Sequence, residues 1–328
     1  MAFRLIGAAI LACHLSAATP KPAFEIRGEV LPHRVASVSL HAIANPFAVS
    51  TLAGPDGHFR CKEVEPGTYT LSVATLLGSE VRKTVEIGAA TADKRGRVRL
   101  GISLDGDAYS PAEAAKVTVR TLQIPDRAER EYEQALSKIA RRDFDGALAC
   151  LRRGVEIAPK FSAAWNQLGT MAYQTQHYRE AADYFRKGME ADPNAYEPLV
   201  NLGGVLLNLQ SLDEALKYNS EAVRRRPEDA LAQSQLGMTY ALLNHFDGAE
   251  KHLLISIRLD PDHFSRPQLT LADVYIRKNE PERAADQLEA FLRSHPDWSK
   301  AEKMKESIAQ WRSRSRQVAD GNAAEDRK

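Results

Sequence analysis

The second half of the chain repeats itself with a period of 34 residues. Prolines recur with spacings of 34, 34, 34 and 35 residues, at Pro159, Pro193, Pro227, Pro261 and Pro296. A set of alanines has the same spacings, at Ala147, Ala181, Ala215, Ala249 and Ala284. Because independent positions share one period, this half consists of copies of one small structural unit. Such a unit cannot bury its own apolar face and must stack on its neighbours.

A leucine followed by a small residue also stays in register within the period. These pairs are Leu168–Gly169, Leu202–Gly203, Leu236–Gly237 and Leu271–Ala272. Two helices approach closely only where a small side chain lies between them, and a proline ends a helix because it lacks an N–H. The pattern therefore predicts pairs of antiparallel helices, each pair ending near a proline.

The second unit shows the pattern most completely, in Trp165, Leu168, Gly169, Tyr178, Ala181, Phe185 and Pro193. This pattern resembles the tetratricopeptide repeat (TPR). The resemblance implies an all-α solenoid, a right-handed α-α superhelix of five units: 128–161, 162–195, 196–229, 230–264 and 265–298. The first unit departs from the pattern at Gln134-Ala135, and the fifth contains one extra residue near Phe264–Ser265.

The same resemblance implies a concave groove lined by the first helix of each unit. The residues at the matching positions are Asn166, Thr170, Tyr173, Gln174, Val200, Leu207, Asn208, Ser234, Met238 and Leu242. Apolar side chains mixed with amides suit an extended peptide or a partner helix. Some family members hold a C-terminal carboxylate with Lys, Asn and Arg, but the basic residues are missing here at the matching positions. We therefore expect no such clamp.

Residues 24–104 follow a different period. Apolar residues alternate with polar ones in Phe24–Val30, Val35–Ile43, Thr68–Val73, Val81–Ile87 and Val98–Leu104. A period of two predicts strands with one buried face, and about seven strands in roughly 80 residues predict a β-sandwich. We therefore expect a multidomain chain, with an all-β sandwich followed by an all-α solenoid.

Two turns of this region carry a second resemblance. Asp56-Gly57 precedes Phe59, and a Pro-Gly turn ending at Gly67 precedes Tyr69. This arrangement resembles the carboxypeptidase regulatory-like domains, which are small prealbumin-like Greek-key sandwiches. The resemblance implies positive φ angles at both glycines and a spacer or weak protein- or glycan-binding module. It does not imply a peptidase, and residues 24–104 contain no His-x-x-Glu or His-Glu-x-x-His pair for zinc.

The first residues favour export. Arg4 precedes a short apolar run, and Ser16 and Ala18 are the small residues expected at a cleavage site, so 1–18 is predicted to be a signal peptide. Alternatively, the segment ending at Cys13 resembles a lipobox and would carry a lipid anchor, or the N-terminus is retained. We expect a periplasmic, cell-envelope-associated or secreted protein. An oxidising compartment would permit a disulfide between Cys61 and Cys150, but they fall in different predicted domains, so we expect two small buried residues.

Charge and motifs argue against several other classes of protein. The chain has 44 Lys+Arg and 43 Asp+Glu, a net charge of +1, which gives no overall attraction to nucleic acid or anionic membrane. No run reaches the ~18–20 apolar residues of a transmembrane segment. No phosphate loop, nucleophile elbow or metal motif is present, so we expect no enzyme, cofactor or metal site. Asp105 and Asp107 alone are too few ligands for calcium.

Residues 105–127 are predicted to be a linker, in which 117–124 is either an edge strand or a tether. After the repeats, Ala301, Met304, Ile308 and Trp311 lie on one helical stripe. This stripe predicts a capping helix over 299–316, followed by a disordered tail over 317–328.

Three functions fit this organisation. The leading hypothesis is a non-enzymatic, exported interaction scaffold that binds a peptide or partner protein in the TPR groove. The alternative is a carbohydrate- or surface-polymer-binding accessory protein that uses the sandwich. Exposed aromatics would favour it, but we expect Phe24, Phe47, Phe59 and Tyr69 to be core residues. A third is a subunit of an enzyme complex whose active site lies elsewhere.

Overall fold

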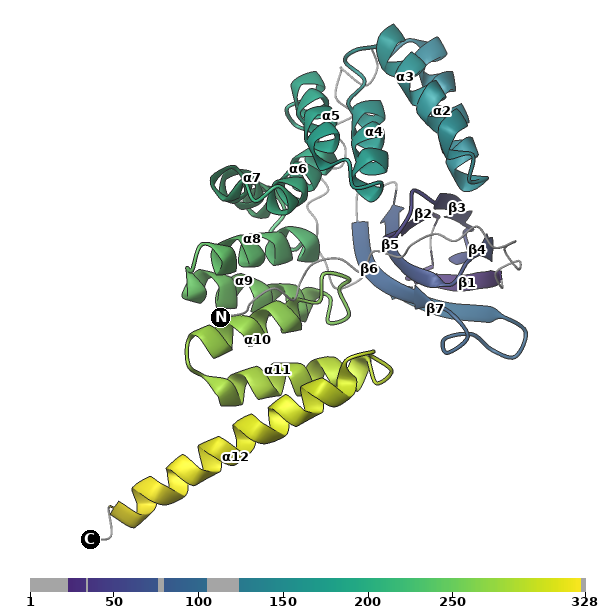
Figure 1. The fold of residues 1–328 in the computed structure, drawn as a ribbon. Helices are drawn as coiled ribbons and strands as arrows, with labels where there is room; N and C mark the ends of the chain where they lie inside the picture. Colours follow the sequence, from purple (N-terminus) through teal and green to yellow (C-terminus); the bar gives the residue numbers. More distant parts are fainter. Residues whose placement is uncertain (1–22, 34, 76–79, 105–123, 326–328) are drawn as a thin grey trace, which may run out of the picture.

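The computed structural model describes residues 23–33, 35–75, 80–104 and 124–325. In this part of the chain seven strands are followed by eleven helices (Figure 1). The predicted fold class, an all-β sandwich followed by an all-α solenoid, is therefore confirmed. The predicted signal peptide, the anchor at Cys13 and linker residues 105–123 lie outside the described residues.

The strands form two sheets. They are β1 (Phe24–Leu31), β2 (Ala36–Ala42), β3 (Ala48–Ala53), β4 (His58–Val64), β5 (Gly67–Thr75), β6 (Glu80–Ile87) and β7 (Arg97–Ser103). One sheet has the order β4-β1-β7 and the other β3-β2-β5-β6. Strand β1 runs antiparallel to β4 and parallel to β7, whereas the pairs of the larger sheet are all antiparallel. The strand β6 therefore forms one edge of the larger sheet.

The sandwich core follows the alternation in the sequence. Phe24, Phe47, Phe59 and Tyr69 are all buried, as expected. Gly57 has φ +75°, which confirms one of the two predicted positive φ angles. The prediction for Gly67 is wrong: its φ is not positive, because this residue already belongs to β5 and pairs with Ile87 in the ladder.

The helices form five antiparallel pairs and a terminal helix. The first helices of the pairs are α2 (Asp126–Ala140), α4 (Ser162–Gln174), α6 (Tyr196–Asn208), α8 (Ala230–Leu242) and α10 (Pro267–Arg277). The second helices are α3 (Phe144–Ile157), α5 (Tyr178–Ala191), α7 (Leu212–Arg225), α9 (Phe246–Leu259) and α11 (Pro281–Ser294). Each second helix ends two residues before one of the periodic prolines. This is where a proline stops a helix.

The small residues of the repeat allow close helix contact. A Cβ added at Gly169 would lie 2.5 Å from the ring of Phe185, and one added at Gly237 would lie 2.7 Å from Leu253. The turn inside each pair contains a residue with positive φ, at Arg142, Gln176, Gln210, Asn244 and Asn279. None of these is glycine, so the sequence carried no obvious sign of this conformation.

At three of the periodic prolines, a side chain from the first helix of the next unit donates to the proline carbonyl. Trp165 Nε1 donates to Pro159 O at 2.9 Å, and Gln233 Nε2 donates to Pro227 O at 2.6 Å. Gln268 Nε2 makes the same bond to the carbonyl of the next periodic proline, at 2.5 Å. Each of these bonds joins the end of one unit to the first helix of the next.

The last helix, α12 (Ala301–Glu325), packs on the final repeat. Ile308 is buried there, and Met304 and Trp311 pack against the same cluster. The helix is longer than the predicted 299–316, so residues 317–325 of the expected disordered tail are helical. No proline follows Pro296 that would end it earlier.

Candidate binding groove and interdomain pocket

The sandwich lies inside the curve of the helical array, on the side of the first helices of the pairs (Figure 1). It therefore faces the concave groove that the sequence assigned to a partner. Contacts between the two domains are made at three places: near α2, at the end of α4, and at the start of α6 and α8. The periodicity of the repeats gave no indication of this arrangement.

The first contact joins the sandwich to unit one. The Arg142 guanidinium lies 2.8 Å from the Glu65 carboxylate, and its Cζ is 4.9 Å from the centroid of the Phe47 ring. The Tyr69 hydroxyl donates to the Glu65 carbonyl at 2.8 Å and so fixes the turn that carries this carboxylate. Ala48 packs against the apolar core of the first unit. An ion pair, a cation–π contact and apolar packing thus combine at one end of the interface.

The second contact involves a predicted groove residue. Gln174 Nε2, at the end of α4, donates to the Ala42 carbonyl at the end of β2, at 3.1 Å. Gln174 Oε1 is buried and has no hydrogen-bond partner among the described residues. This amide therefore binds the chain's own sandwich.

The third contact is electrostatic and involves the edge strand β6. Arg82 lies 3.2 Å from Glu197 at the start of α6 and 3.8 Å from Asp229 before α8. Two residues further along β6, the Thr84 N–H donates to Asp260 Oδ2 at 3.1 Å. An uncovered sheet edge invites pairing with other chains, and here the turns of the solenoid cover part of it.

Asp229, which contacts Arg82, is also fixed by hydrogen bonds within the solenoid. Its Oδ1 accepts hydrogen bonds from the N–H groups of Leu231 and Ala232, at 2.8 and 3.2 Å, and so caps α8. Its Oδ2 accepts one from the Tyr196 hydroxyl at 3.0 Å. Burial and the nearby Asp229 charge raise the pKa of Tyr196, so this hydroxyl stays a donor.

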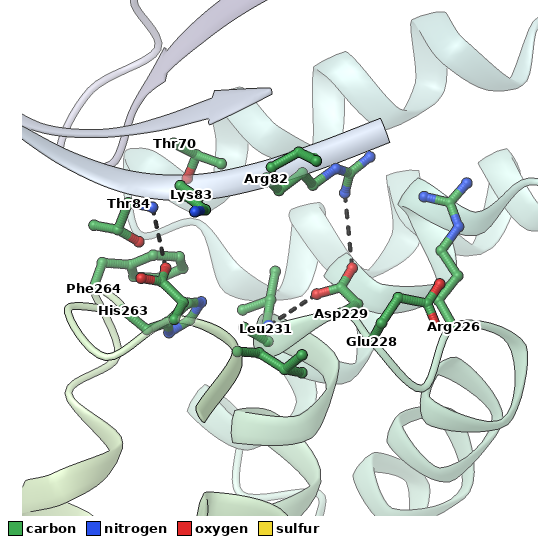
Figure 2. A pocket seen from close by; sticks show the side chains of 14 residues that line it. Thr70, Arg82, Lys83, Thr84, Arg226, Glu228, Asp229, Leu231, His263 and Phe264 are labelled. Atoms are coloured by element: carbon green, nitrogen blue, oxygen red, sulfur yellow. Dashed lines mark hydrogen bonds and ion pairs between the residues drawn. The ribbon is translucent and has the colours of Figure 1, made fainter. Parts of the chain in front are cut away.

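A pocket of about 120 Å³ lies between β6 and the turns that precede α8 and α10 (Figure 2). Its walls come from both domains: Thr70, Val81, Arg82, Lys83, Thr84, Arg226, Glu228, Asp229, Ala230, Leu231, Leu259, Asp260, His263 and Phe264. Burial lowers the pKa of His263, although the charges of Asp260 and Asp229 raise it. The imidazole is therefore neutral at pH 7, and the carboxylates supply the charge on the solenoid side.

The predicted groove residues fall into three groups, which are exposed, half-buried and buried. Tyr173 and Leu242 are 38% and 52% exposed, and Asn208 is exposed and donates to the Tyr173 hydroxyl at 3.3 Å. Asn166, Thr170, Gln174, Leu207 and Met238 are half-buried. Val200 and Ser234 are buried inside the solenoid, where the hydroxyls of Ser234 and Ser265 lie 2.6 Å apart. These last two do not line an open groove, because the next unit packs on them.

The residues that join the domains were not singled out from the sequence. Arg82, Glu197, Asp229 and Asp260 stand at positions with no repeated charge pattern. One signal was present: the extra residue of unit five lies in the turn between α9 and α10 that also carries His263 and Phe264 of the pocket. An insertion in an otherwise regular repeat indicates a turn with a contact of its own.

In the described ranges, no three His, Cys, Asp or Glu side chains gather in a way that could hold a metal ion. Over those ranges, too, every helix is too short or too polar to cross a lipid bilayer. Cys61 and Cys150 are both buried free thiols, as the sequence predicted.

The helical half of the chain matches a known protein family. The family model described as tetratricopeptide repeat matches residues 132–196, 172–230 and 200–264. Residues 132–264 are thus similar to a tetratricopeptide-repeat array. Repeats of this family generally act as protein-interaction scaffolds, which present extended concave surfaces.

Curated relatives match about half of the chain. Human cell division cycle protein 16 homolog is 30% identical over 162 residues, which covers 46% of this chain and 25% of the relative. Protein FlbA of Caulobacter vibrioides is 26% identical over 184 residues, covering 56% of this chain and 31% of the relative. The chain thus spans about a quarter to a third of the length of these relatives.

Solved structures are also similar to this chain. YrrB, a TPR protein described as having an unusual peptide-binding site, has a TM-score of 0.48 and 24% identity and covers 58% of this chain and 98% of its own. PilF of Pseudomonas aeruginosa has a TM-score of 0.46 and 19% identity and covers 64% of this chain and 100% of its own.

Proposed function

We propose that this protein is a non-enzymatic, exported scaffold that binds an extended peptide or partner protein in the concave TPR groove. The observation that carries the proposal is the row of exposed side chains at the ends of α4, α6 and α8. Tyr173, Asn208 and Leu242 stand there on three consecutive units and remain accessible although the sandwich faces the same groove. An aromatic ring, an amide and an aliphatic side chain in one row match an extended peptide.

The sandwich has a positioning role in this proposal. We assign residues 24–104 to the carboxypeptidase regulatory-like type. In support, seven strands form two sheets, and Gly57 has its expected conformation in the turn between β3 and β4. A spacer or folding module of this type restricts how a partner enters the groove. Export is inferred from the first 18 residues of the sequence alone.

The alternative, glycan binding by the sandwich, gains no support from the exposed residues. The large apolar side chains exposed on the described part of the sandwich are Leu31, Val35 and Leu52, and none is aromatic. Proteins that bind sugars usually stack them on an exposed ring, so the groove is the better candidate.

The test is affinity capture from a native envelope fraction with three baits. They are the full chain, a Tyr173→Ala/Asn208→Ala variant and a Leu52→Ala variant, each shown by circular dichroism to be folded. We expect one partner to be retained by the full chain and by Leu52→Ala, and at least tenfold less by the double variant. A partner retained by the double variant and lost by Leu52→Ala would move the function to the sandwich.

A further inference from the structure

A group of carboxylates on the solenoid contacts strand β6. Glu197, Asp229 and Asp260 come from the starts of α6 and α8 and the end of α9, and all three contact the same strand. Figure 2 shows Arg82 and Thr84 on β6 pointing to the carboxylates of the turns below. We refer to Glu197, Asp229 and Asp260 as the acidic receptor.

Asp260, a buried member of the acidic receptor, accepts a hydrogen bond from β6. Asp260 is 6% exposed, and in the described part of the chain its carboxylate takes its side-chain hydrogen bond from the Thr84 N–H. A buried carboxylate without a donor is strongly disfavoured. If β6 leaves, water, another N–H donor or a cation takes the place of the Thr84 N–H at this carboxylate.

Charge on the two sides is complementary. The solenoid side of the pocket carries Glu228 as well as Asp229 and Asp260 of the acidic receptor, against the cation Arg226. Arg226 lies 3.6 Å from Glu197, with its Cζ 4.0 Å from the centroid of the Tyr196 ring. The strand side contributes the cations Arg82 and Lys83. An occupant of this site must therefore be extended and basic.

The two groups of β6 that contact the acidic receptor are two residues apart, and this spacing defines a sequence motif. The guanidinium that reaches Glu197 and Asp229 belongs to residue 82, and the N–H that reaches Asp260 belongs to residue 84. In an extended chain residues 82 and 84 lie about 7 Å apart along the strand, and the long side chain of residue 82 reaches the same turns of the solenoid as the backbone N–H of residue 84. Any extended segment with an arginine two residues before a free backbone N–H presents the same pair.

We propose that β6 is a replaceable occupant, and that an extended partner segment carrying this arginine motif competes with it for the acidic receptor. This inference rests on the proposed function, since it names the chemistry of the partner. The sandwich then acts as a built-in competitor: it covers the receptor until a partner segment displaces β6.

The test uses a defined probe, a fluorescein-labelled peptide with the sequence of residues 80–87, Glu-Val-Arg-Lys-Thr-Val-Glu-Ile. Fluorescence anisotropy measures its binding to the full chain and to an Arg82→Ala/Arg142→Ala variant, which loosens both charged ends of the interface. We expect the variant to bind at least tenfold more tightly than the unaltered chain. A peptide with Gln in place of its Arg is the matched control and should lose this gain.

A second variant locates the binding site. Adding Glu197→Gln and Asp229→Asn to the loosened chain removes two charges, while Asn still caps α8. We expect peptide binding to weaken at least tenfold again, with an unchanged circular dichroism spectrum. Small-angle scattering of the loosened variant should show a larger radius of gyration than that of the full chain.

Two results would overturn the proposal. Domains that separate in the scattering experiment without any gain in peptide binding would show that the receptor has no affinity for the motif. Domains that stay together, with unchanged peptide binding, would show that β6 is a permanent part of the interface. Peptide binding together with failed capture through Tyr173 and Asn208 would instead refute only the proposed groove function.

Discussion

The two halves of the molecule are stabilised in different ways. The sandwich has one apolar core, to which strands distant in sequence contribute: β1 pairs with both β4 and β7. The solenoid has four smaller clusters, each formed mainly by neighbouring helices. A fold with one shared core unfolds as a unit, whereas a stack of repeats can lose single units. The domains meet through ion pairs, hydrogen bonds and a cation–π contact, together with the packing of Ala48 against unit one.

The largest expected effect is on the solenoid. Ala181 is fully buried between α5 and its neighbours, so Ala181→Arg places a charge without a partner in the core of unit two. The expected loss is about 3–5 kcal/mol. Circular dichroism should show helix melting in two steps, while hydrogen exchange of β5 stays slow. A single step shared by both domains would contradict their independence.

A matched change in the sandwich should act on the whole domain. Leu40 is fully buried, and Leu40→Ala is expected to destabilise by about 2–5 kcal/mol. Hydrogen exchange should then accelerate in both sheets together, with the helices α8 to α11 unaffected. Leu52→Ala is the control, because Leu52 is 70% exposed on the same sheet and should change stability by less than about 0.5 kcal/mol.

Glycine-to-alanine substitutions at Gly57 and Gly67 should affect stability differently. Gly57 has φ +75°, and a Cβ there would lie 2.5 Å from the Val30 carbonyl oxygen, so Gly57→Ala should cost about 1–3 kcal/mol. Gly67→Ala is the matched control: its φ is not positive and its Cβ would make only an ordinary contact, 3.5 Å from Tyr69. Urea titrations of both variants measure the difference, and equal losses would contradict this structure.

A smaller effect is expected at the carbonyl of the periodic proline. Gln233 is buried, donates to Pro227 O and lies 2.7 Å from His252 Nδ1. Gln233→Leu leaves both groups without this partner and should cost about 1–2 kcal/mol. Leu199 occupies the same position in unit three, so the fold itself should tolerate leucine there. Thermal melting measures the loss, and an unchanged melting temperature would show that the bond contributes nothing.

A last prediction concerns the cysteines of the folded chain. Burial raises the pKa of Cys61 from 9.0 to about 11, so its thiol stays protonated when the pH rises from 7 to 9. Above pH 9 the unfolded chain loses this proton first, and the stability of the sandwich should fall between pH 9 and 11. Iodoacetamide should label neither Cys61 nor Cys150 at pH 8. In the Ala181→Arg variant, labelling of Cys150 should rise before that of Cys61.

Much of the architecture could be predicted from periodicity. Five copies of a 34-residue pattern gave the helix pairs, because the small residues and prolines act inside each unit and between neighbours. Alternation gave the sandwich and its buried aromatics for the same local reason. The prediction at Gly67 was wrong because a Pro-Gly turn can also lead straight into a strand. Val200 and Ser234 were assigned to an open groove because position in a repeat does not show how closely the next unit packs.

The placement of the sandwich against the solenoid was decided by tertiary structure. Arg82 and Glu197 are 115 residues apart in sequence, and Thr84 and Asp260 are 176 apart. Neither pair follows a period, because each charge faces the other domain and has no counterpart in neighbouring units. Local patterns determine helices, strands and their cores, since these depend on residues a few positions apart. A contact between two folded surfaces depends on shape and charge at single positions, which become neighbours only after both domains have folded.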